Sequence, residues 1–235
     1  MAEIIVALDV PDGSEALRLV DRIGPELDFV KVGLELFTRE GPDVVRRLQD
    51  RGLRIFLDLK LHDIPNTVAA AVRSASALGV DLLTVHASGG RRMLEAAVTS
   101  REGPLALLAV TVLTSLDRSE LREAWGREDE SDPSAEAPRL AALAVECGID
   151  GIVSSAREAA AIRRRVGADP LIVTPGIRMA GGATHDQRRV ATPGSAVREG
   201  ATHLVLGRAV TAAPRPSEAL AEVRAELQSV AGGVR

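Results

Sequence analysis

The feature that most constrains this chain is an alternation, repeated eight times, between short apolar runs and longer amphipathic runs rich in alanine and arginine. Short runs that are almost entirely apolar are typical of parallel strands covered on both faces. A strand that alternates with a helix builds a right-handed βαβ unit. The expected strands are Ile4–Asp9, Phe29–Gly33, Arg54–Lys60, Leu82–His86, Ala106–Leu113, Gly151–Ser154, Leu171–Thr174 and His203–Leu206.

Eight such units predict an α/β fold, namely one (β/α)8 TIM barrel over residues 1–235, with a doubly wound open sheet as the alternative. Helix signals support this register. Asp12 or Ser14 can cap the first helix, and Pro65 suits the first turn of the helix that follows the third strand. Residues 117–138 depart from the pattern, and we predict an extended connection there with one short helix.

Composition excludes several classes of function. The net charge of −4 gives no reason to expect nucleic-acid binding, and a chain with 2% aromatic residues and no tyrosine is poorly suited to base stacking. No apolar run reaches the roughly 20 residues that span a bilayer. The one cysteine, Cys147, lies in an apolar helical run and cannot form an intrachain disulfide. We expect no signal peptide, no membrane partner and a cytoplasmic location.

Charged residues interrupt the third expected strand. Asp58 and Lys60 share one face of a strand, and burying them is costly unless they satisfy each other. One such pair is most simply a structural ion pair. Asp63 follows where the strand breaks, and Lys31 lies within the preceding strand. The resulting Lys-Asp-Lys-Asp set would keep Lys60 protonated and indicates an electrostatically tuned active site.

Other polar residues stand where the expected strands end, which is where the working residues of such barrels cluster. They are Asp9, His86, Ser88, Thr111, Thr114, Ser154, Ser155, Thr174, Arg178, Gly207 and Arg208. His86 is interpreted as structural, because it forms no metal-ligand spacing with the other histidines.

Two loops suggest a phosphate site. Arg178 ends the run Thr-Pro-Gly-Ile-Arg after the seventh strand, and we expect residues 179–187 to form a phosphate lid in which Gln187 reaches a ligand. A solvated surface loop is the alternative. After the eighth strand, Gly207 allows an anion to approach backbone amides, and Arg208 can make a bidentate contact. The loops after strands seven and eight commonly bind phosphate in these barrels.

The spacing D-x-K-x-x-D-I-x-x-T, formed by Asp58, Lys60, Asp63, Ile64 and Thr67, resembles the signature of the orotidine 5'-monophosphate decarboxylase family. The resemblance extends in order from Asp9 to Arg208. It includes Lys31 followed by Val-Gly-Leu-Glu-Leu-Phe, the run Val-Thr-Val-Leu-Thr-Ser around Thr114, and the run that ends at Arg178. Met179 and His185 depart from the family pattern and leave the shape of the lid open.

The resemblance implies that orotidine 5'-monophosphate is decarboxylated to UMP without metal or organic cofactor. Lys60 would donate a proton to carbon 6, while Asp58, Asp63 and Lys31 would complete the catalytic set. It also implies a homodimer in which Asp63, Ile64 and Thr67 reach the partner's active site. The implied substrate-binding residues are Asp9, Lys31, Asp58, Ile64, Thr67, Thr114, Arg178, Gln187, Gly207 and Arg208.

Three alternatives stay open at this point. A sugar-phosphate decarboxylase or aldolase of the same superfamily would depend on magnesium, although Lys31 argues for the metal-free branch. A phosphosugar isomerase or an amino-acid-biosynthetic barrel would share only the phosphate site and leave the charged set unexplained. A catalytically silent nucleotide-binding protein has no need of a lysine among carboxylates.

Overall fold

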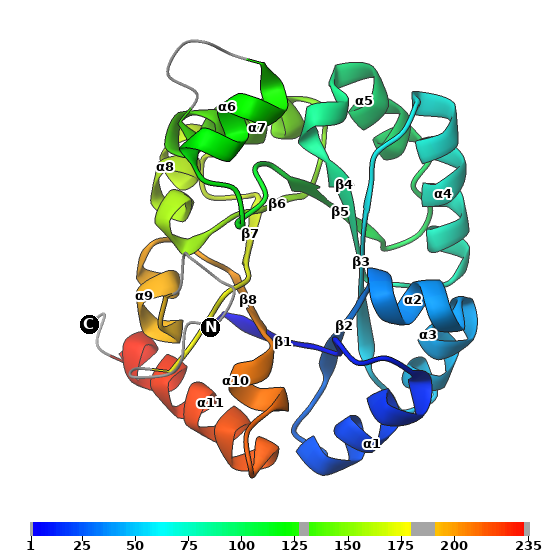
Figure 1. Ribbon diagram of the computed structural model, residues 1–235, viewed down its shortest axis with the longest axis vertical. Helices are drawn as coiled ribbons and strands as arrows, with labels where there is room; N and C mark the ends of the chain where they lie inside the picture. The colour runs from blue at the N-terminus through cyan, green and yellow to red at the C-terminus, as the bar shows by residue number, and fades with distance from the viewer. Residues whose placement is uncertain (1, 127–131, 180–190, 233–235) are drawn as a thin grey trace.

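Eight parallel strands close into a barrel in the order β1 to β8, as the computed structural model shows for residues 2–126, 132–179 and 191–232 (Figure 1). β1 pairs with β2 on one side and with β8 on the other, so the predicted (β/α)8 TIM barrel is confirmed and the open sheet is excluded. The strands are β1 Glu3–Ala7, β2 Phe29–Gly33, β3 Arg54–Leu61, β4 Leu82–His86, β5 Ala106–Val110, β6 Gly151–Val153, β7 Leu171–Thr174 and β8 His203–Leu206.

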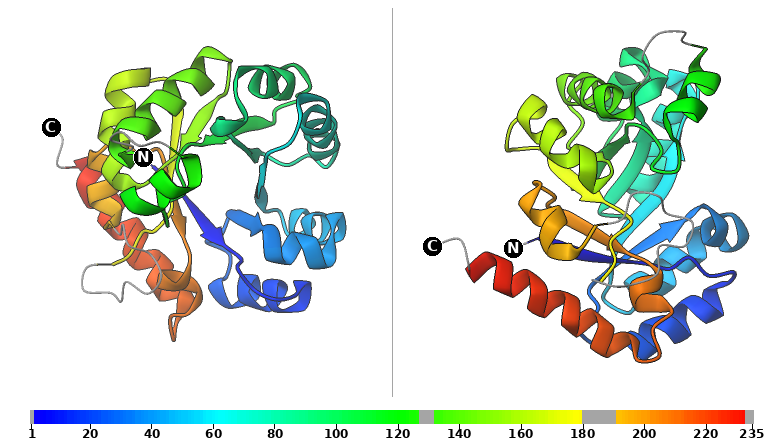
Figure 2. Two further views of the ribbon diagram at one scale, coloured as in Figure 1. Left: turned by 45° about the horizontal axis from the view of Figure 1, so that its top comes forward. Right: turned by 60° about the vertical axis from the view of Figure 1, so that its left-hand side comes forward.

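Helices surround the barrel and connect successive strands (Figures 1 and 2). They are α1 Gly13–Ile23, α2 Leu34–Glu40, α3 Pro42–Gln49, α4 Pro65–Ala77, η1 Ala87–Gly89, α5 Arg91–Thr99, α6 Arg118–Trp125, α7 Pro133–Glu146, α8 Ala156–Val166, α9 Pro193–Arg198, α10 Arg208–Thr211 and α11 Pro216–Gly232. Asp12 caps α1 by accepting the Glu15 N–H at 2.8 Å, and Pro65 begins α4, as the sequence predicts. In the described ranges, no helix is long and apolar enough to cross a membrane.

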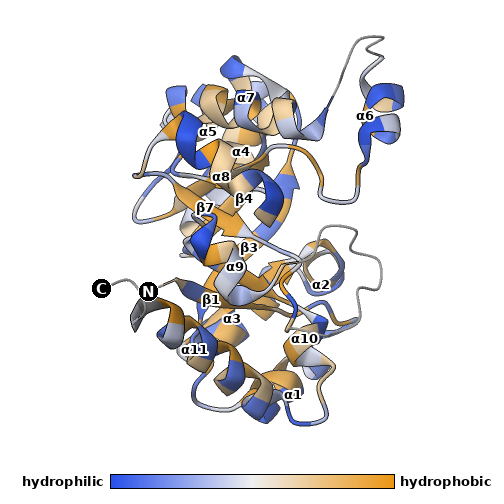
Figure 3. Ribbon diagram, turned by 90° about the vertical axis from the view of Figure 1, so that its left-hand side faces the viewer, coloured by the Kyte–Doolittle hydropathy of each residue, from blue (hydrophilic) through white to orange (hydrophobic). Residues whose placement is uncertain are grey.

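Residues 117–138 contain more helix than we expected. α6 is the expected short helix, and its capping box joins Asp117 and Glu120. α7 already begins at Pro133, because Asp132 caps its first turn by accepting the Ser134 N–H at 3.0 Å. Pro138, the last residue of this range, lies inside α7. α6 stands apart from the barrel wall on the right in Figure 3.

Apolar side chains fill two separate regions. One cluster lies inside the barrel and includes Ile5, Phe29, Phe56, Leu108 and Val205. A larger cluster packs the outer faces of the strands against the helices. Figure 3 shows this pattern as apolar strands surrounded by helices that carry polar residues on their outer sides. Strands buried on both faces explain the nearly continuous apolar runs in the sequence.

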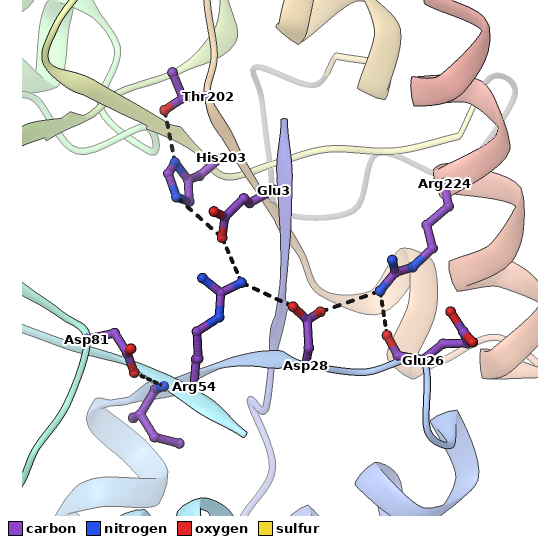
Figure 4. A network of polar contacts seen from close by, with 9 residues as sticks. Glu3, Glu26, Asp28, Arg54, Asp81, Thr202, His203 and Arg224 are labelled. Atoms are coloured by element: carbon purple, nitrogen blue, oxygen red, sulfur yellow. Dashed lines mark hydrogen bonds and ion pairs between the residues drawn. The ribbon is translucent and has the colours of Figure 1, made fainter. Parts of the chain in front are cut away.

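A polar network closes the amino-terminal end of the barrel (Figure 4). Arg54 Nη2 lies 2.7 Å from Glu3 Oε2 and 3.1 Å from Asp28 Oδ2, and the Arg54 guanidinium lies 4.3 Å above the ring of Phe29. Arg224 of α11 joins the network at Asp28 Oδ1, 3.4 Å away. The first three strands and the last helix are therefore linked at the end opposite to the polar strand ends.

Candidate active site

Strand alternation places a polar layer above the apolar interior of the barrel. Phe29 and Phe56 point inward, so Lys31 and Asp58, each two residues further along the same strand, also point inward. Asp9 follows Ala7 of β1 in the same way. Because all eight strands are parallel, these charged groups meet at the carboxyl-terminal end of the barrel.

Together with Lys60, these three residues form a continuous chain of ion pairs. Lys31 Nζ lies 2.9 Å from Asp9 Oδ1 and 3.7 Å from Asp58 Oδ2. Lys60 Nζ lies 2.8 Å from the same Asp58 oxygen. Asp58 therefore lies between two ammonium groups, and both Lys31 and Asp58 are buried. This alternation of charge satisfies ions that would otherwise be expensive to bury.

Lys60 has an unusual backbone conformation. Its φ of 52° is the one positive value found for a non-glycine residue in the parts of the chain described. The pairing between β3 and β4 shifts here, from Leu57 opposite Leu83 to Leu61 opposite Val85. This bulge interrupts the regular ladder, and such irregularities often re-aim a side chain near a functional site.

The charged chain lines part of a cavity of about 410 Å³, which is within the usual range for small-molecule sites. Thr114 and the apolar side chains of Val112 and Leu113 line it as well. Arg178, Gly207 and Arg208 line it from the loops after β7 and β8. The cavity lining thus combines the charged pairs, neutral side chains and two guanidinium groups.

The guanidinium part of the cavity lining is suited to an anion. Arg178 is buried, and burial together with the charge of Arg208 lowers the pKa of its guanidinium. Its Nη1 donates to the carbonyl of Ile177 at 2.9 Å, while its Nε has no partner within the described residues. A Cβ added at Gly207 would meet no atom of the described residues within 4 Å, so among these residues there is open space at this part of the cavity wall.

Three sequence-predicted residues do not line this cavity. Asp63, Ile64 and Thr67 are exposed, and Ile64 has a relative accessibility of 67%. Asp63 accepts the N–H of Ile64 and makes no ion pair with any residue that the structure describes. Gln187, together with the expected lid over residues 180–187, lies outside the described residues.

A histidine pair stands beside the charged chain. The rings of His62 and His86 stack with centroids 5.2 Å apart and an angle of 30° between the planes. Burial, followed by the charges of His62 and Lys60, lowers the pKa of His86 to about 4. His86 is therefore neutral at physiological pH. The spacing of these residues in the sequence did not indicate this contact, because it joins β4 to the end of β3.

Two further observations concern possible metal ligands and the one thiol of the chain. Across the described ranges, no three His, Cys, Asp or Glu side chains are grouped so that they could hold a metal ion. Cys147 is a free, buried thiol, and burial raises its pKa, while Arg91 Nη1 lies 3.7 Å from its Sγ.

Sequence reasoning missed Thr84 of β4, which is fully buried beside Asp58. Its hydroxyl accepts the backbone N–H of Lys60 at 2.8 Å and donates to Asp58 Oδ1 at 3.0 Å. The signal that could have found it is strand register, since Phe56 pairs with Leu82 and the residue two positions further on each strand is Asp58 or Thr84.

Comparison with curated proteins finds close relatives. A protein from Moorella thermoacetica named orotidine 5'-phosphate decarboxylase is 52% identical over 97% of this chain and 93% of its own length. A protein of the same name from Halorhodospira halophila is 53% identical over 95% of both chains.

Solved structures agree with these relatives. The orotidine 5'-phosphate decarboxylase from Lactobacillus acidophilus superimposes with a TM-score of 0.85 and 35% identity over 96% of this chain and 99% of that chain. An uncharacterized conserved protein from Geobacillus kaustophilus gives a TM-score of 0.82 and 40% identity, over 95% of this chain and 99% of that chain. The model of the orotidine 5'-phosphate decarboxylase / HUMPS family matches residues 2–223. The chain therefore belongs to the orotidine 5'-phosphate decarboxylase / HUMPS family, and it is an enzyme of the carboxy-lyase class.

Proposed function

We propose that this enzyme decarboxylates orotidine 5'-phosphate to UMP and carbon dioxide, the last step of de novo pyrimidine synthesis, in the cytoplasm and without a metal or organic cofactor. The observation that carries the proposal is the chain Asp9–Lys31–Asp58–Lys60 in the wall of a cavity that Arg178 and Arg208 also line. The names of the curated relatives support the same reaction.

The chemistry requires a group that tolerates and then quenches a carbanion. When the bond between carbon 6 and the carboxylate breaks, its electron pair stays on carbon 6 and carbon dioxide leaves. The pyrimidine ring delocalises this charge poorly, so a slow reference reaction of this kind needs on the order of 20 kcal/mol of transition-state stabilisation. A preorganised ammonium group beside the reacting carbon supplies part of it.

Lys60 is the proposed proton donor. Its Nζ is held by Asp58 and lies in the cavity wall, so it can stabilise the developing carbanion and then transfer a proton to carbon 6. The neutral amine that remains regains a proton from solvent after product leaves. Asp58 orients Lys60, while Lys31, paired with both Asp9 and Asp58, fixes the carboxylates. Asp9 and Lys31 are proposed to contact the ribose, and Thr114 the pyrimidine.

Phosphate binding is assigned to the part of the cavity lining that follows β7 and β8. Arg178 and Arg208 provide two cationic groups, and Gly207 leaves room for a phosphate oxygen near the backbone. Gln187 is proposed to contribute from the lid. Binding energy from this remote group can close the site and increase turnover instead of only tightening substrate binding.

A homodimer is the proposed assembly. Ile64 is a large apolar residue with high exposure; Asp63 precedes it, and Thr67, also exposed, lies in the first turn of α4. We propose that these three residues enter the partner's active site, where Asp63 completes the charged set. Sedimentation measurements on the wild type and Ile64→Asp test this. A monomeric wild type that turns over normally would contradict it.

The experiment for the reaction is an absorbance assay with orotidine 5'-phosphate in the presence of EDTA. The wild type should consume the substrate, and Lys60→Ala should lose about 100-fold or more in kcat. Arg215→Ala removes an exposed cation outside the cavity and should behave as the wild type. A folded wild type without turnover would reject the proposed reaction. Turnover of orotidine 5'-phosphate that returns only with magnesium would reject the metal-free part of the proposal, and equal turnover by Lys60→Ala would reject the proton donor.

A further inference from the structure

The bulge in β3 interrupts its hydrogen-bonded ladder with β4. Between the pairs Leu57–Leu83 and Leu61–Val85, three residues of β3 lie opposite the single residue Thr84 of β4. Backbone N–H groups at such a position lose their ladder partners, and a buried N–H without a partner is costly. The N–H of Lys60 donates instead to Thr84 Oγ1 at 2.8 Å.

The same hydroxyl also holds the catalytic carboxylate. Thr84 Oγ1 donates its proton to Asp58 Oδ1 at 3.0 Å. The direction of both bonds is fixed, because a backbone N–H can only donate and a carboxylate can only accept. Thr84 has a relative accessibility of 0%, so water does not compete for either bond.

The two carboxylate oxygens of Asp58 therefore have different partners. Oδ2 faces the ammonium groups of Lys60 at 2.8 Å and Lys31 at 3.7 Å. Oδ1 accepts the hydrogen bond from Thr84. The terminal torsion of an aspartate side chain has a broad distribution, and this hydrogen bond restricts it. Thr84 also holds the backbone of Lys60 in its left-handed conformation, with φ at 52°. The Thr84 side chain thus fixes both the backbone from which the Lys60 side chain extends and the Asp58 carboxylate that binds its ammonium group.

We propose that Thr84 is a positioning residue that sets the geometry of the Asp58–Lys60 pair through these two hydrogen bonds. The inference rests on the proposed function, because it assigns Thr84 an effect on the proton-donating lysine. Thr84 does not line the cavity, so its contribution is to the reacting geometry and not to contact with the substrate.

Thr84→Val tests this, since valine has nearly the same shape and lacks the hydroxyl. It should lower kcat by about 10- to 100-fold, the loss expected for a hydrogen bond to a charged group. KM should change by less than about threefold, because Arg178, Gly207 and Arg208 are untouched. Thr84→Ser restores the hydroxyl and should recover kcat to within about threefold of the wild type.

Thr202→Val is the matched control. The Thr202 hydroxyl also accepts a backbone N–H, that of Ile172 at 2.9 Å, and it contacts His203 Nδ1 at 2.9 Å. It lies at the amino-terminal end of the barrel, away from the cavity (Figure 4). This variant should lose stability in urea unfolding while kcat stays at the wild-type value.

Three outcomes would overturn the inference: wild-type kcat in Thr84→Val, a rise in KM without a fall in kcat, or no recovery in Thr84→Ser. If Thr84→Val does not fold, Thr84→Cys carries the test, since a thiol of similar size forms weaker hydrogen bonds and should give an intermediate kcat. Wild-type kcat in a folded Thr84→Cys would then overturn it. A wild type that does not act on orotidine 5'-phosphate would instead reject the proposed function, which the wild-type assay alone decides.

Discussion

The neutral histidine beside the active site gives a prediction about pH and stability. The pKa of His86 is lowered from its ordinary value of 6.5 to about 4, first by burial and then by the charges of His62 and Lys60. Below pH 6.5 the unfolded chain binds a proton at this residue and the folded protein does not. Stability is therefore lost as the pH falls from about 6.5 towards about 4.

The size of the effect follows from these two values. Between pH 7 and pH 5, a shift from 6.5 to about 4 corresponds to about 2 kcal/mol of lost unfolding free energy. His86 is only partly buried, and solvent screening reduces this to about 1 kcal/mol. His86→Asn removes the titrating group and should lose about 1 kcal/mol less than the wild type over the same interval.

Urea unfolding followed by circular dichroism at pH 7 and pH 5, at one fixed protein concentration, measures this difference. His62→Asn should show a smaller pH effect than the wild type, because it removes the second cause of the shift. His203→Asn, at the other end of the barrel, should also lose less stability than the wild type over this interval, because burial lowers the pKa of His203 as well. If His86→Asn loses as much stability as the wild type, the reasoning about His86 is refuted.

Three glycines lead to further predictions. Gly33→Ala places a Cβ 3.0 Å from Lys31 Nζ, so it should lower kcat in the orotidine 5'-phosphate assay while the melting temperature stays nearly unchanged, and an unaltered kcat would contradict this. Gly151→Ala places a Cβ 2.6 Å from Leu171 Cβ between two strands and should cost about 2 kcal/mol or more in urea unfolding, which a wild-type midpoint would refute. Gly207→Ala meets no atom of the described residues, so it should fold normally yet raise KM about tenfold by crowding the phosphate, and a wild-type KM would remove the phosphate from this position.

Much of the fold could be predicted from the sequence because the apolar runs, the amphipathic runs and the helix caps all indicate the same alternation of strands and helices. The range Phe29–Gly33 was predicted with its bounds, since aromatic and β-branched residues surround its one charged residue, Lys31. Alternation alone placed Asp58 and Lys60 on one face, and they form an ion pair at 2.8 Å. Strand ends were harder to predict. β5 ends at Val110 instead of Leu113, because apolar composition continues after the ladder of hydrogen bonds has ended.

The remaining parts of the site depend on which strands are neighbours and in what register. The contact between Thr84 and Asp58 joins residues 26 positions apart and is fixed by the pairing of β3 with β4. The left-handed backbone of Lys60 follows from the bulge in that pairing, and lysine itself has no preference for it. The stacking of His62 on His86 also depends on β3 and β4 being neighbours. The positions of Asp63, Ile64 and Thr67 relative to a second subunit remain a prediction.

The closure of the barrel by β1 and β8 has a consequence for how this chain folds. Glu3 of β1 pairs with His203 of β8, about 200 residues further along the chain, whereas β1 meets β2 through the much nearer pair Val6–Val30. Contacts between distant residues form late, because a long loop must be closed before they contribute. Until β8 arrives, β1 keeps an unpaired edge that can pair with another chain. The docking of β8 onto β1 is therefore a step at which aggregation competes with productive folding.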